Sequence, residues 1–154
     1  MKIAFVFLVS LIGIQGYACH QNKTADRTIN SNIASNPDTM TIKITVGTSV
    51  FTATLGDNKT AAAFKSRLPL TIQMTELNRN EKYGDLSENL PVNASLPGTI
   101  QNGDLMLYGS RTLVLFYKTF STSYSYTRIG HVHNPSGLAA ALGAGDVSVT
   151  FEEE

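Results

Sequence analysis

The chain has 154 residues, with 12 Lys and Arg balanced by 12 Asp and Glu, so its formal net charge is zero. This length suits one domain, and an apolar fraction of 42% is typical of a globular protein. The balanced charge argues against a protein dedicated to binding nucleic acid, because no excess charge is left to attract phosphate. The single cysteine excludes an internal disulfide and a cysteine-rich zinc site.

The first 18 residues have the features of an export signal. Lys2 precedes an apolar run over residues 3–14, which is short for a transmembrane helix, and small residues follow up to Ala18. Cys19 comes next, and this arrangement resembles the lipobox of bacterial lipoproteins, whose signal peptide is cleaved before a cysteine that carries diacylglycerol. The resemblance implies lipidation of Cys19 and a place in the cell envelope, anchored to a membrane. The alternative is an ordinary signal peptide with a secreted or periplasmic product.

The residues after Cys19 predict a tether. Residues 20–37 are rich in Asn, Ser and Thr and show no hydrophobic period of a helix or a strand. We therefore divide the chain into a signal peptide over 1–18, a lipidated cysteine and polar tether over 19–38, and a folded domain over 39–154.

The pattern from residue 41 onward predicts a β-hairpin followed by a helix. Apolar and polar residues alternate over 41–46 and again over 51–55, after a turn that begins on a glycine. Residues 57–58 can cap a helix over 59–68, because apolar residues recur on one helical face and a proline then stops the helix.

The middle of the chain combines a strand, a polar stretch and a second hairpin. Alternation over 70–74 predicts a third strand, and residues 76–91 form a polar insertion that is too long to be a mere turn. Residues 104–108 and 112–118 predict a hairpin. The second of these strands is apolar on both faces, so we expect it at the centre of a sheet.

The last part of the chain predicts two more strands, over 125–132 and 147–151, with a short helix over 138–142 between them. Seven or eight strands at such spacing, with two short helices, favour a sandwich or a closed barrel. Closure would leave no exposed sheet edge.

Three segments of the folded part resemble the small bacterial cyclophilin-like family: PGTIQNGDLMLYGSRTLVLFYKTF (97–120), YSYTRIGHV (124–132) and GLAAALGAGDVSVTFE (137–152). The resemblance extends over about residues 41–152. It implies a mainly β protein, a closed antiparallel cyclophilin-like β-barrel of about eight strands with two short helices. The family name describes a fold, and a fold does not establish an activity.

True cyclophilins are peptidyl-prolyl isomerases in which an arginine hydrogen-bonds the proline nitrogen. Their Phe-His-Arg-x-Ile and Phe-x-x-x-Gln-x-Gly patterns are absent from this sequence. Arg79 and Arg128 are the candidates for a catalytic arginine, and the alternative for each is a solvated surface side chain. Whether the protein is an enzyme therefore stays open, with an isomerase that uses non-standard residues as one hypothesis.

Aromatic residues mixed with hydroxyl groups predict a ligand-binding groove. Such a surface can take apolar rings and also hydrogen-bond a peptide or a small organic molecule. The groove requires residues 76–91 to fold back over the barrel near the strand after Phe120; the alternative is that the rings belong to the core. The predicted ligand-binding residues are Glu81, Tyr83, Tyr108, Phe120, Tyr124, Tyr126 and Arg128.

His131 and His133 would share one face of a strand as a possible metal pair, but no third ligand accompanies them, so we expect surface histidines and neither a metal nor another cofactor. The sequence thus predicts an exported, lipid-anchored domain that binds a peptide or a small ligand. Besides the isomerase, a structural partner in an envelope assembly remains as an alternative.

Overall fold

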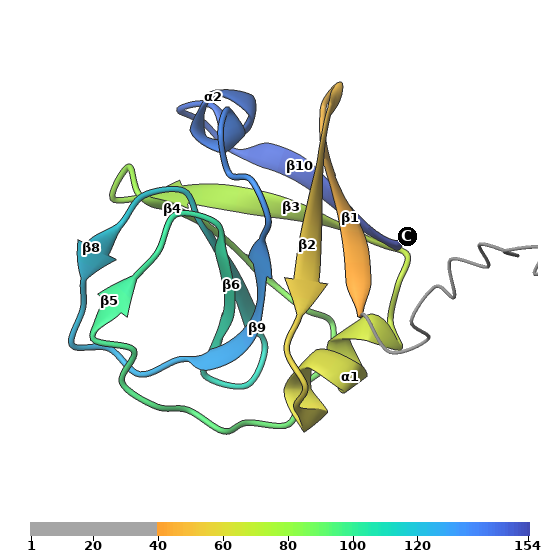
Figure 1. Ribbon diagram of the computed structural model, residues 1–154, viewed down its shortest axis with the longest axis vertical. Helices are drawn as coiled ribbons and strands as arrows, with labels where there is room; N and C mark the ends of the chain where they lie inside the picture. Colours follow the sequence, from red (N-terminus) through yellow and green to blue (C-terminus); the bar gives the residue numbers. More distant parts are fainter. Residues whose placement is uncertain (1–39) are drawn as a thin grey trace, which may run out of the picture. The chain divides into compact units, whose positions relative to one another are not determined.

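The computed structural model describes residues 40–154, so the predicted signal peptide, Cys19 and the tether over 19–38 lie outside the described residues. The described part forms a closed barrel in which neighbouring strands are antiparallel, in the order β1-β10-β3-β4-β7-β6-β9-β2 (Figure 1). The predicted mainly β class and the closed barrel of eight strands with two short helices are confirmed. No helix within residues 40–154 has the length and apolar character needed to span a bilayer.

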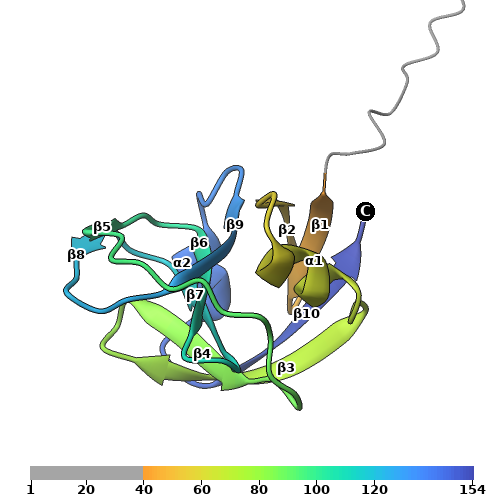
Figure 2. The same ribbon diagram turned by 90° about the horizontal axis from the view of Figure 1, so that it is seen from below.

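The barrel strands are β1 (Thr41–Val46), β2 (Ser49–Leu55), β3 (Leu70–Leu77), β4 (Glu81–Asp85), β6 (Asp104–Tyr108), β7 (Thr112–Phe116), β9 (Thr127–Val132) and β10 (Val147–Glu153). Two further strands, β5 (Thr99–Ile100) and β8 (Phe120–Ser121), pair in a small separate sheet. Both views show this small sheet on the side of the barrel away from the β1–β2 hairpin (Figures 1 and 2). The helices are α1 (Lys59–Lys65) and α2 (Leu138–Leu142).

The alternation read from the sequence sets which side chains fill the barrel. On β1, for example, Ile42, Ile44 and Val46 are buried, and the residues between them are partly exposed. Each helix adds side chains to this core: Phe64 of α1 packs edge-on against Phe151, with 5.6 Å between ring centroids, and both leucines of α2 are buried. The interior is therefore a packed apolar core, and the outer face remains available for a site.

Helix α1 begins as predicted but ends three residues earlier. The side chain of Asn58 caps it by accepting a hydrogen bond from the backbone N–H of Ala61 at 2.9 Å. The helix ends at Lys65, and the next N–H groups, of Arg67 and Leu68, bond three residues back, in a tighter turn.

The polar stretch over 76–91 is not the insertion that the sequence predicts, because it contains the end of β3 and all of β4. Strand β4 is polar in sequence, yet its second residue, Lys82, is fully buried inside the barrel. The Nζ atom of Lys82 donates hydrogen bonds to Glu76 at 2.5 Å and to the backbone carbonyls of Gly143 and Gly145 at 2.9 and 2.6 Å. All three ammonium hydrogens are used, so the buried charge is both paired and fully bonded.

Candidate functional site

A second apolar cluster forms on the outer face of β4, β7 and β6. Val114 of β7 lies opposite Tyr83 of β4 and Met106 of β6, so the three side chains share one face of the sheet. Phe116, on the same face of β7, is fully buried beneath the small β5–β8 sheet residues Ile100 and Phe120. The outer surface of the barrel thus carries a packed layer of apolar and aromatic side chains, which we call the floor.

A cavity of about 660 Å³ opens above this floor, in the size range of small-molecule sites. The turn between β3 and β4 and the outward face of β4 lie on one side of it, and residues 120–126 lie on another. The 76–91 segment and residues 120–126 therefore meet at this cavity, but the first segment does so as part of the barrel wall and does not fold back over the barrel. The lining residues are Leu77, Asn78, Asn80, Glu81, Tyr83, Asp85, Tyr108, Thr112, Val114, Phe120, Ser121, Thr122, Ser123, Tyr124 and Tyr126.

Three tyrosines in mutual contact extend from the buried floor of the cavity to its exposed rim. Tyr126 is 7% exposed and meets Phe116 edge-on at 5.5 Å between ring centroids. Tyr108 lies 5.6 Å from Tyr126 and 6.3 Å from Tyr124, which it meets edge-on. Tyr108 and Tyr124 are 47% and 62% exposed, so the aromatic surface at the rim is open to solvent.

Glu81 is a carboxylate in the cavity wall without a partner. Its residue is only 8% exposed, and no group within residues 40–154 donates a hydrogen bond to it or forms an ion pair with it. Burial, followed by the charge of Glu76, raises the pKa of Glu81 to about 7. Glu81 is therefore poised to lose or take up a proton near neutral pH.

The other carboxylate of the cavity, that of Asp85, already has hydrogen-bond partners. Its two oxygens accept hydrogen bonds from the Thr112 hydroxyl at 2.7 Å and from the Arg111 guanidinium at 2.9 Å. These two bonds lower the pKa of Asp85, so its charge is already compensated.

Asn80 also lines the cavity. Its side-chain Oδ1 is buried and has no hydrogen-bond partner among the described residues. The backbone carbonyl of Asn80 accepts from the N–H of Tyr117 at 2.9 Å, and the preceding Asn78 and Arg79 take positive φ angles of 54° and 58°. The tight β3–β4 turn thus holds Asn80 and Glu81 side by side in the chain at the cavity wall.

The structure gathers six of the seven predicted ligand-binding residues around this cavity: Glu81, Tyr83, Tyr108, Phe120, Tyr124 and Tyr126. Arg128, the seventh, is not among the lining residues. Arg79 does not line the cavity either; its side chain is exposed, and its backbone N–H bonds to Glu76. A role for either arginine in isomerisation gains no support from this geometry, and the binding roles of the other six stay predictions.

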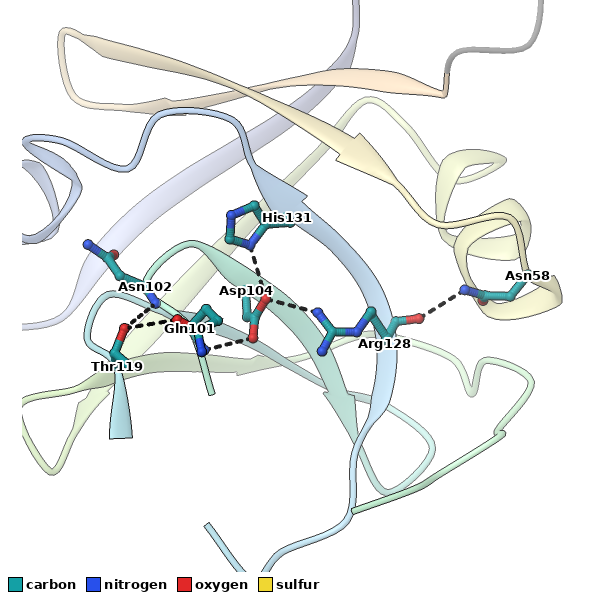
Figure 3. Close-up of polar contacts among 7 residues, drawn as sticks. All are labelled: Asn58, Gln101, Asn102, Asp104, Thr119, Arg128 and His131. Carbon is teal, nitrogen blue, oxygen red and sulfur yellow. Dashed lines mark hydrogen bonds and ion pairs between the residues drawn. The ribbon is translucent and has the colours of Figure 1, made fainter. Parts of the chain in front are cut away.

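Arg128 belongs instead to a polar network around Asp104, a fully buried residue of β6 (Figure 3). One oxygen of Asp104 lies 3.0 Å from the Arg128 guanidinium and 3.0 Å from Nδ1 of His131, and the other accepts from the backbone N–H of Gln101 at 2.9 Å. His133 bonds to the hydroxyl of Thr54, so the two histidines have separate partners. Within residues 40–154, no group of three or more His, Cys, Asp or Glu side chains could hold a metal ion.

Sequence reasoning missed several lining residues. The outward-facing positions on β7, Thr112 and Val114, follow from strand alternation once β7 is known to have one face outside the barrel. No local pattern points to Asn78 and Asn80, because they enter the site only through the β3–β4 turn, which the sequence does not predict.

The comparisons with known proteins agree with this fold. No curated protein matches the chain. The solution structure of a hypothetical protein from Archaeoglobus fulgidus is similar, with a TM-score of 0.59 and 18% identity, over 75% of this chain and 95% of that one. At this identity the likeness shows the fold alone. A model of the cyclophilin-like family matches residues 44–152, most of the chain, and the protein therefore belongs to the cyclophilin-like family.

Proposed function

We propose that this barrel binds a small organic molecule or a peptide side chain in the cavity on the outer face of β4, β7 and β6. The observation that carries the proposal is a cavity of about 660 Å³ whose lining includes five aromatic residues, two of them with rings substantially exposed at the rim. Exposed rings around a cavity supply apolar contact area, and the hydroxyl groups of residues 121–123 add hydrogen-bonding groups.

The rim geometry supports binding by stacking. Tyr108 and Tyr124 meet edge-on, so a flat or apolar group of a ligand can contact the face of one ring and the edge of the other. The floor below them is fixed, because Tyr126 and Phe116 are buried and packed edge-on. A rigid floor lowers the entropic cost of binding, since few side chains need ordering.

The experiment is a screen of the full-length protein by ligand-observed NMR, with small aromatic alcohols, amides and amines and with proline-containing peptides. We expect aromatic members to bind the wild type and to lose most of their binding in Tyr124→Ala. Val50→Ala is the matched control, because Val50 is 60% exposed on β2 and does not line the cavity. If no compound binds, or if Tyr124→Ala binds as well as the control, the proposal is wrong.

We also propose that the chain is exported and anchored to a membrane through lipidated Cys19. The support comes from the sequence: a basic residue, a short apolar run, and the chain's single cysteine directly after Ala18. An anchored domain on a polar tether would present its cavity in the cell envelope.

A further inference from the structure

The charged residues that line the cavity are all acidic. Its lining includes two carboxylates, Glu81 and Asp85, and no Lys, Arg or His. Asp85 is already compensated by Arg111. Glu81 is therefore the one lining charge that has no opposite charge beside it among the described residues.

Glu81 is the carboxylate in the cavity wall that lacks a partner. Its residue is 8% exposed, and no group among residues 40–154 donates a hydrogen bond to its carboxylate or pairs with it. A carboxylate that has lost much of its hydration gains from a cationic donor. A ligand that brings several N–H donors and a positive charge would supply that partner.

We propose, building on the function proposed above, that the cavity selects ligands that carry a primary ammonium group on an apolar body. The ammonium donates to Glu81, and the apolar body lies against Tyr108 and Tyr124 at the rim. A primary ammonium has three donors and a full charge, which matches the two oxygens of a carboxylate.

The surroundings of Glu81 contain little that would compete with such a ligand. The titratable groups that act on Glu81 or feel its charge are Glu76 on β3 and the hydroxyls of Tyr117 and Tyr126. Burial raises the pKa of both tyrosines, followed by the hydrogen bond to Glu76 for Tyr117 and by the charge of Glu81 for Tyr126, so both stay neutral. The negative charge of Glu76 adds to the preference for a cation, although Lys82 offsets it in part.

A pH dependence follows from the ionisation of Glu81. The pKa of Glu81 is about 7 in the free protein, and a bound cation favours the ionised form. Binding at pH 7 should therefore release about half a proton per ligand bound, and the affinity for a cation should rise about tenfold between pH 6 and pH 8. A neutral ligand of the same shape should show no such rise.

The test titrates the full-length protein by calorimetry with benzylammonium and with benzyl alcohol, a neutral probe of similar size and shape. At pH 8 we expect benzylammonium to bind about tenfold more tightly than benzyl alcohol. Glu81→Gln should remove that preference and its pH dependence. Glu88→Gln is the matched control, because it removes the same charge from a side chain that is 80% exposed and outside the cavity.

The outcomes separate this inference from the proposed function. If benzyl alcohol binds as tightly as benzylammonium, the cavity binds ligands but does not select ammonium groups, and the inference is wrong. A preference for benzylammonium that survives in Glu81→Gln also overturns it. If neither probe binds the wild type, both the inference and the binding function lose their support. The wild-type measurement of proton release needs no variant, so the inference stays testable even if Glu81→Gln does not fold.

Discussion

Replacing Phe116 and Tyr124 in turn should have very different effects on stability. Phe116 is fully buried and packs against Phe120 and Tyr126, with ring centroids 5.7 and 5.5 Å away. Truncating a buried phenylalanine to alanine typically costs about 3–5 kcal/mol of unfolding free energy. Tyr124 is 62% exposed, and its ring contact with Tyr108 is an edge-on pair, which is worth about 0.5–1.5 kcal/mol.

The assay is equilibrium urea unfolding of the full-length protein, followed by circular dichroism. We expect Phe116→Ala to lose about 3–5 kcal/mol and Tyr124→Ala about 1 kcal/mol or less, a gap of roughly 2–4 kcal/mol. The slope of unfolding free energy against urea should be the same in both variants, so that the midpoints report stability. Equal losses in the two variants would place Tyr124 in the core and refute the rim that we describe.

Three further predictions concern buried charge and the anchor. Lys82→Met should cost about 3–5 kcal/mol in the same urea assay, because it removes the cation paired with Glu76 and the donor to two backbone carbonyls, whereas exposed Lys118→Met should cost almost nothing. The pKa of Glu81 is raised from 4.5 to about 7 on folding, so the folded state holds more protons in that window and unfolding free energy should fall by about 2 kcal/mol between pH 5 and pH 8. Glu81→Gln should flatten this fall and Glu88→Gln should not; an unchanged slope in Glu81→Gln would contradict the assignment. Cys19→Ser should move the protein out of the membrane fraction, and a variant that fractionates and migrates like the wild type would disprove the lipid anchor.

The barrel could be predicted because most strands carry their own pattern. In β1 and β10 the fully buried positions are apolar and recur with the period of a strand, and in β7 a run of four apolar residues is buried on both faces, so local sequence and final environment agree. The family resemblance implies that the strands close into a barrel, but the order of the strands is not predicted, since pairing between distant segments leaves no local signal.

Strand β4 could not be predicted for a physical reason. Its inward residue Lys82 is charged, and the groups that make this burial possible lie at Glu76, Gly143 and Gly145, two of them about 60 residues away. A pattern of hydrophobicity cannot anticipate such partners. The β3–β4 turn was missed for the same reason, and with it the contribution of Asn80 to the cavity.

The aromatic residues of the cavity were predictable as a set, because their mixture with hydroxyl groups over residues 120–126 is visible in the sequence. Arg128 follows the same stretch in the sequence but faces elsewhere. It lies on β9, and the buried carboxylate of Asp104 on β6 holds its guanidinium (Figure 3). Closeness in sequence to residues 120–126 therefore led to the prediction that Arg128 lines the cavity. It could not reveal that Asp104, which lies on another strand, pairs with this arginine.

A crystal structure of the protein with benzylammonium tests the central claim most directly, because it locates the ligand. We predict density for the ring against Tyr108 and Tyr124, with the nitrogen about 3 Å from the Glu81 carboxylate. A cavity that stays empty at a concentration that saturates binding in solution, or a probe bound at another surface, would contradict the account.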